Sequence, residues 1–140
     1  MDNKSSITVG ANVEAPVGLV WKLWTHPDDV LHWNAASADW HTTKAENDLK
    51  EGGAFSYRME ARDGSFGFDF SGVYDKIITN ELIEYTLGDN RKVRIIFSSS
   101  TGQTMIAETF EAETTHPVEL QQAGWQAILN NFKLYAETRG

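Results

Sequence analysis

One carboxylate stands inside an apolar run, where a charged group could serve acid–base chemistry or anchor a ligand. In MIAETFEA, residues 105–112, Glu108 shares its parity with Ile106 and Phe110. If those two side chains point into the concave face of a sheet, Glu108 does too, and burial would raise its pKa. Two plainer interpretations stay open. The other parity faces inward and leaves Glu108 solvated, or Glu108 is a structural residue with a buried partner.

The remaining polar residues predict no metal site, cofactor or nucleophile. The chain has four histidines, which are His26, His32, His41 and His116. Their spacing matches no zinc signature such as H-E-x-x-H. The chain has no cysteine and no G-x-S-x-G motif. Its glycines do not open a helix directly after a strand, as a phosphate-binding loop requires. We therefore expect no metal, no cofactor and no catalytic residues that the sequence alone could identify.

Aromatic side chains are the stronger theme. Plain core packing explains any one of them, yet as a set they could line a cavity for an apolar ligand. Together with Glu108, the candidate cavity residues are Trp33, Trp40, Phe55, Tyr57, Phe68, Phe70, Trp125 and Phe132.

Three short elements open the chain and would position Trp33. Residues 6–15 alternate apolar and polar side chains, which predicts a strand with one buried face. Helical spacing follows Pro16, and the His26-Pro27 step predicts a break before a second short helix that ends at Trp33. We expect the tryptophans at positions 21 and 24 to fasten the first helix to the sheet. Trp33 is then expected at the mouth of the cavity.

The middle of the chain, from residue 38 to about 113, has the period of two that is typical of strands. Asp63-Gly64 predicts a hairpin between two of them. Asp69 lies between two phenylalanines and should point away from them, to the outer face. Residues 116–137 then carry apolar side chains at spacings of three and four, which predicts one long amphipathic helix against the sheet. Its stripe begins at Leu120 or Gln121.

Composition narrows the class of protein. The 140 residues suit a single domain, residues 1–140, and the formal charge of −8 disfavours nucleic acid as a partner. No run approaches the eighteen apolar residues of a membrane span, and the first residues lack the apolar run of a signal peptide. We therefore expect a cytoplasmic protein without a membrane span.

Three segments in this order carry a resemblance to a known family: APVGLVWKLWTHPDDVLHW, DLKEGGAFSYRMEARDGS, and ETFEAE with QQAGWQAILNNFKLYAE. The chain resembles the SRPBCC or START-like superfamily. Within it, the chain is similar to the branch named after the C-terminal domain of the activator of the ninety-kilodalton heat-shock chaperone ATPase. The resemblance implies an α+β helix-grip fold. In that fold a curved antiparallel sheet of about six or seven strands wraps around the long C-terminal helix, and two short helices close one end of a cavity.

The resemblance leaves three functions open. The first is binding of a hydrophobic, aromatic or lipid-like small molecule in the cavity. The second is a co-chaperone-like interaction domain with a heat-shock chaperone as its partner. The third is an enzyme of the cyclase or dehydratase type, with Glu108, Tyr57 or Tyr74 in general acid–base catalysis. The sequence is compatible with a monomer or a homodimer.

Overall fold

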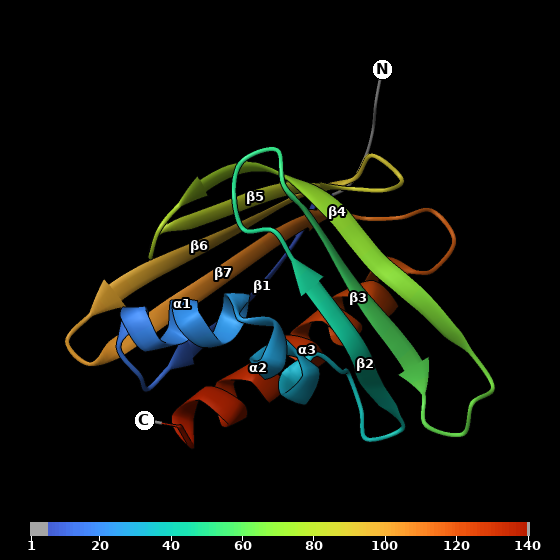
Figure 1. The fold of residues 1–140 in the computed structure, drawn as a ribbon, viewed down its shortest axis with the longest axis horizontal. Coiled ribbons are helices and arrows are strands. Elements are labelled where there is room, and N and C mark those ends of the chain that lie inside the picture. The colour runs from blue at the N-terminus through green and yellow to red at the C-terminus, as the bar shows by residue number, and fades with distance from the viewer. Residues whose placement is uncertain (1–5, 140) are drawn as a thin grey trace.

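A computed structural model describes residues 6–139, and Figure 1 shows its ribbon. Strands and helices follow one another in the predicted order. They are β1 (Ser6–Val13), α1 (Val17–Thr25), α2 (Pro27–Trp33), β2 (Trp40–Asn47), β3 (Ala54–Ala61), β4 (Gly67–Ile78), β5 (Leu82–Leu87), β6 (Lys92–Ser100), β7 (Gln103–Glu111) and α3 (Val118–Glu137).

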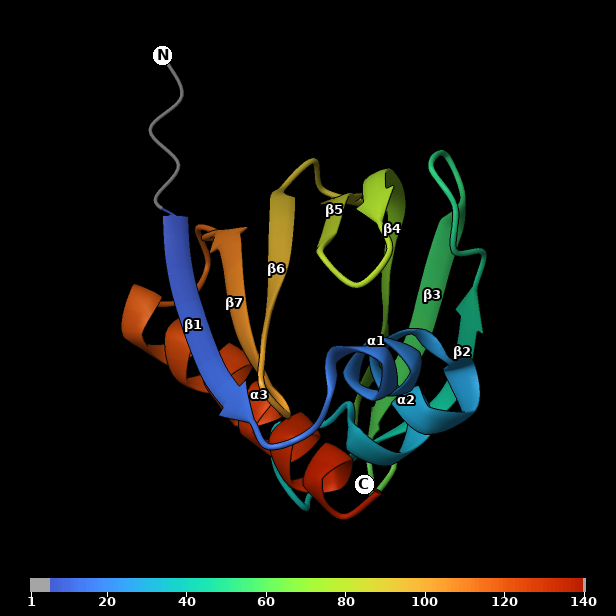
Figure 2. The same ribbon diagram turned by 90° about the vertical axis from the view of Figure 1, so that its left-hand side faces the viewer.

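The strands form one antiparallel sheet in the order β1-β7-β6-β5-β4-β3-β2. All neighbours except β1 and β7 are consecutive in sequence, so short hairpins connect most of the sheet. The sheet is curled into a half-barrel, and α3, α1 and α2 lie on its concave side (Figure 2). This is the α+β helix-grip architecture that the resemblance implied.

Local residue choices explain the element boundaries. β1 ends at Val13, two residues before the predicted end, because the next backbone N–H, that of Glu14, donates to the Glu137 carboxylate instead of extending the ladder. Pro16 precedes α1, and His26 is extended between α1 and α2, as expected of a residue before proline. The Asp63-Gly64 turn is present, with Gly64 at φ 77°, where a side chain would be strained.

Helix α3 is held against β1 by polar contacts along its exposed side. Gln126 exchanges hydrogen bonds with the backbone of Gly10, its Nε2 donating to the carbonyl oxygen at 2.9 Å. About two turns further towards the C-terminus, Lys133 Nζ donates to the Asn12 carbonyl oxygen at 2.7 Å. The helix therefore runs beside the β1 edge and contacts α1 and α2. Its inner side faces the concave surface of the sheet, where it can enclose space.

The hydrophobic core fills most of the volume between sheet and helices. Its fully buried apolar side chains come from both sides of that volume, and include Val20, Val30, Ile83, Ile95, Ile106, Phe110, Leu129 and Phe132. No helix within residues 6–139 is both long enough and apolar enough to cross a membrane.

Candidate functional site

A cavity of about 70 Å³ remains between the concave face and the helices. It is large enough for a few water molecules or for a small chemical group. Aromatic and aliphatic side chains supply nearly all of its wall. The lining residues are Trp24, Trp33, Asn34, Phe55, Tyr57, Met59, Phe70, Tyr74, Ile83, Tyr85, Glu108, Trp125 and Ile128.

Glu108 contributes a carboxyl group to this apolar wall. In β7 the residues Ile106, Glu108 and Phe110 all face the core, and Glu108 keeps only 6% of its surface exposed. The carboxyl makes no hydrogen bond or ion pair with any residue in the range 6–139. Fully enclosed side-chain polar atoms in that range all have partners, so the unpaired oxygens of Glu108 border the cavity space itself. The parity that places Glu108 inward is therefore the correct one.

Burial changes the acidity of this group. Desolvation disfavours the charged carboxylate and raises the pKa of Glu108 to about 8. Below that pH the side chain is a neutral carboxylic acid, which can donate one hydrogen bond as well as accept. Glu108 therefore presents an O–H donor to the cavity at neutral pH.

Three tyrosines add hydroxyl groups to the same wall. Tyr74 donates to Asn47 Oδ1 at 2.6 Å, and burial raises its pKa to about 12. Burial also holds the pKa of Tyr57 and Tyr85 well above the ordinary value, and the charge of Glu108 adds to this effect at Tyr85. All three hydroxyls therefore stay protonated across the physiological range.

The rings around these groups are locked by mutual packing. Trp125 of α3 stacks on Phe110 with a centroid distance of 3.8 Å and an interplanar angle of 10°. Trp33 packs on Trp24 at 4.9 Å, and its indole N–H donates to the Leu23 carbonyl oxygen at 3.0 Å. Such pairs fix ring orientation, so the wall is preformed rather than fluid.

A family model described as "Activator of Hsp90 ATPase homolog 1-like protein" matches residues 14–137. The chain belongs to this family. The resemblance drawn from the three sequence segments is thereby confirmed. No curated protein matches the chain.

Solved structures of similar proteins agree with this assignment. An AHSA1-like protein from Aeromonas hydrophila, solved by solution NMR, is 45% identical over 97% of this chain and 94% of that chain, with a TM-score of 0.91. A protein from Cytophaga hutchinsonii is 52% identical over 99% of this chain and 94% of that chain, with a TM-score of 0.80. A protein from Nitrosomonas europaea is only 17% identical over 99% of this chain and 98% of that chain, with a TM-score of 0.82. It therefore shows the shared fold alone.

Six of the nine predicted cavity residues of this family member line the cavity. Those that line the cavity are Trp33, Phe55, Tyr57, Phe70, Glu108 and Trp125. Three do not. Trp40 and Phe68 lie outside the cavity, in a groove between the first half of α3 and the strands β2, β3 and β4, where Phe68 is 40% exposed. Phe132 is fully buried beneath Trp24 and Trp33, so it supports the wall without reaching the cavity.

Several lining residues are not among the predicted ones, for identifiable reasons. Met59 shares the parity of Tyr57, and Ile128 lies on the apolar stripe of α3, so their patterns carried a usable signal. Tyr85 of β5 shares its parity with Ile83 and Leu87, so its pattern carried a signal as well. Asn34 follows α2 in a loop, and no periodicity applies there.

The tryptophans of α1 divide differently from the prediction. Trp21 is buried and packs edge-on against Phe97 of β6 at 5.3 Å, as an anchor should. Trp24 also packs against Phe97, at 5.8 Å, but its ring reaches the cavity wall as well. Trp33 is at the cavity as predicted. Helices α1 and α2 therefore supply two lining tryptophans, Trp24 and Trp33, rather than one.

Asp69 confirms the alternation in β4. Its side chain lies on the outer face, where the carboxylate is 3.6 Å from Arg58 Nη1 of β3. Both groups are solvated, so this pair contributes little to stability.

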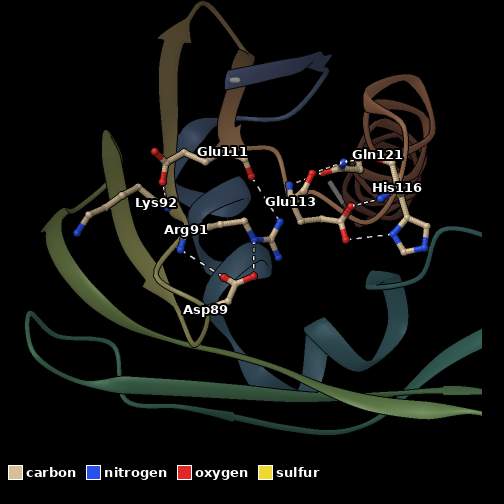
Figure 3. Close-up of polar contacts among 7 residues, drawn as sticks. All are labelled: Asp89, Arg91, Lys92, Glu111, Glu113, His116 and Gln121. Carbon is tan, nitrogen blue, oxygen red and sulfur yellow. Dashed lines mark hydrogen bonds and ion pairs between the residues drawn. The ribbon is translucent and has the colours of Figure 1, made fainter. Parts of the chain in front are cut away.

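Polar contacts fix the start of α3, and with it the position of Trp125. Figure 3 shows Gln121 bridging to the loop before the helix. Its Oε1 accepts from the Glu113 N–H at 2.9 Å, and its Nε2 donates to the carbonyl oxygens of Glu113 and His116 at 3.0 and 2.8 Å. The Glu113 carboxylate accepts from the His116 backbone N–H, and its second oxygen lies 3.1 Å from the ring Nδ1.

A second group in Figure 3 ties the turn between β5 and β6 to the end of β7. Arg91 donates from Nε to Asp89 Oδ2 at 2.7 Å and from Nη1 to the Glu111 carbonyl oxygen at 3.4 Å. The Lys92 backbone N–H donates to Glu111 Oε1 at 2.6 Å. These contacts hold the strand ends that lie beside Tyr85. The positive charge of Arg91 offsets a small part of the rise that burial causes in the pKa of Tyr85.

Proposed function

We propose that this protein binds a small hydrophobic or aromatic molecule in the cavity between the sheet and α3, with Glu108 as its polar anchor. The observation that carries the proposal is the unpaired, buried carboxyl of Glu108 at the wall of an aromatic cavity. A buried polar group without a partner costs free energy, and a bound ligand that accepts its hydrogen bond recovers that cost.

The chemistry of the wall selects the kind of ligand. Aromatic rings favour an apolar or aromatic body. The protonated Glu108 adds a donor, so a carbonyl or hydroxyl oxygen on the ligand fits better than a hydrocarbon of the same shape. Trp24, Trp33 and Trp125 lie in the wall and supply an intrinsic fluorescent signal for binding.

Acetophenone and ethylbenzene test the proposal because they differ in little besides the carbonyl oxygen. Titration followed by tryptophan fluorescence should show tighter binding of acetophenone, by up to about tenfold for one hydrogen bond. In Glu108→Leu this preference should disappear or reverse, because the donor is replaced by an apolar side chain.

Glu46→Gln is the matched control. The Glu46 side chain on β2 is 68% exposed, so its replacement should leave both affinities unchanged. An absence of any fluorescence response to both compounds, or an equal preference in the wild type and in Glu108→Leu, would contradict the proposal.

Family membership favours a second candidate, an interaction domain that acts on a heat-shock chaperone. The family model is described by its likeness to an activator of the Hsp90 ATPase. ATP hydrolysis by a purified ninety-kilodalton heat-shock chaperone, measured with and without this protein, tests that role. Unchanged hydrolysis together with no co-purification would count against it.

A further inference from the structure

An apolar groove adjoins the cavity on the outside of the fold. It lies between the first half of α3 and the strands β2, β3 and β4, with a volume of about 370 Å³. Its wall is formed by Ala36, Trp40, Met59, Phe68, His116, Leu120, Gln121, Gly124, Trp125 and Ile128. The Leu120 side chain is 58% exposed and Phe68 is 40% exposed, so this apolar surface faces solvent.

The groove and the cavity share three wall residues, Met59, Trp125 and Ile128. These side chains are therefore the partition between the two spaces. Trp125 is held by its stacking on Phe110, whereas Met59 is unbranched and can change rotamer at low cost. A movement of the Met59 side chain would join the spaces without moving the backbone.

The cavity and the groove differ in volume. The cavity, at about 70 Å³, is smaller than the range of roughly 300–1,000 Å³ that ligand sites occupy, whereas the groove at about 370 Å³ lies within that range. A ligand whose oxygen-bearing end meets Glu108 therefore has room for that end only, and the rest must extend past the partition. Self-association over the groove is a poorer explanation of its apolar wall, because each copy carries a charge of −8.

We propose that the outer groove is the second subsite of the ligand, and that the ligand is an elongated amphiphile with an oxygen-bearing end in the cavity and an apolar tail along α3. This inference rests on the proposed function, since it takes Glu108 as the anchor of the polar end. Leu120 and Phe68 contact the tail but not the polar end, and Met59 lies where the two meet.

A series of para-alkylated phenols tests the two subsites separately. Phenol, 4-propylphenol and 4-heptylphenol share the polar end and differ in tail length. Calorimetric titration should show the affinity rising by about three- to fourfold for each methylene that enters the groove. Amide signals of Leu120 and Gly124 in ¹H–¹⁵N spectra should shift with 4-heptylphenol and stay in place with phenol.

Leu120→Gln and Leu134→Gln form a matched pair on the same helix. Leu134 is 64% exposed but lies outside the groove. Leu120→Gln should weaken 4-heptylphenol several-fold and leave phenol unchanged, and Leu134→Gln should change neither. Equal effects of the two substitutions, or an affinity independent of tail length while phenol still binds, would overturn the second subsite and leave the proposed function standing. If no phenol binds, the proposed function fails as well.

Discussion

The raised pKa of Glu108 comes from its burial rather than from a neighbouring charge. Desolvation alone raises its pKa to about 8, and no cationic side chain belongs to the described cavity wall. The three tyrosines of that wall stay protonated, so Glu108 is the one described lining group that titrates near neutral pH. Two predictions follow from this isolation.

The first concerns stability against pH. The folded-state pKa of Glu108 lies above its unfolded value of 4.5, so the folded protein binds more protons between pH 4.5 and about 8. The free energy of unfolding should therefore fall as pH rises through that window, by up to about 1.4 kcal/mol per pH unit from this group. Urea unfolding should show that Glu108→Gln becomes more stable relative to the wild type at pH 8.5 than at pH 5. Parallel pH profiles would contradict a buried, raised carboxyl.

The second concerns ligand affinity. A neutral acceptor such as acetophenone needs the protonated form of Glu108, so its affinity should be constant at low pH and decline above about pH 8. Fluorescence titrations from pH 6 to pH 9.5 measure this, and Glu108→Gln should give a flat profile because an amide keeps its N–H donor. A wild-type affinity that stays constant or rises above pH 8 would contradict the role of Glu108 as a hydrogen-bond donor.

At the scale of elements, α3 decides how much space the sheet encloses. The helix is fixed at its start by Gln121 and along its length by contacts to β1, and it carries Trp125 and Ile128 into the cavity wall. Gln121 is buried although glutamine is usually exposed, because its side-chain amide replaces the backbone partners that the preceding loop lacks.

Replacing this amide by an apolar side chain of similar size should be costly. Gln121→Leu leaves the N–H of Glu113 and two carbonyl oxygens without the partners they have now. We expect a loss of about 1–3 kcal/mol in the free energy of unfolding, measured by urea denaturation. Glu119→Gln, an exposed change two residues earlier, serves as the control and should stay within about 0.5 kcal/mol. A Gln121→Leu variant as stable as the control would show that the bridge contributes nothing.

Gly124 is a position in α3 where a substitution should stabilise the protein. A Cβ built at this position meets no atom within 4 Å, and the backbone is helical. Gly124→Ala should therefore raise the free energy of unfolding by up to about 1 kcal/mol, the usual gain for glycine to alanine inside a helix. Gly72→Ala is the contrasting variant, because its Cβ would lie 2.7 Å from the Thr86 carbonyl oxygen and 2.9 Å from the Phe55 ring. If Gly124→Ala destabilised the protein, the space beside α3 would be smaller than described.

At the scale of the whole molecule, the cavity exists only when α3 covers the sheet. A ligand of the cavity binds the folded state alone, so it should raise the melting temperature as its concentration rises above the Kd. At one hundred times the Kd the gain is about 2.7 kcal/mol, equivalent to several degrees for a chain of this size. Thermal unfolding with 4-heptylphenol measures this shift, and Glu108→Leu should reduce it. An unchanged melting temperature at saturating ligand would rule out binding restricted to the folded state.

Local patterns in the chain were enough to predict the order of elements, the resemblance to the family and the inward-facing candidates in regular strands. A period of two or 3.6 is local, so the parities of Phe55, Tyr57 and Phe70 could be read directly. It also limited Glu108 to two faces without choosing between them. The tertiary structure made that choice, because β1 and β6 flank β7 and their apolar residues face the same core as Glu108.

Packing of the helices against the sheet separated Trp40, Phe68 and Phe132 from the cavity and brought Trp24 and Asn34 to it. Parity gives the face of a strand but not how far along that face the helices extend. How far the helices cover the sheet depends on where α3 packs against β1. That position is set by contacts between residues more than a hundred positions apart, such as Gly10 with Gln126. Such long-range contacts leave no periodic trace in the chain, and they divide the apolar surface into core, cavity and groove.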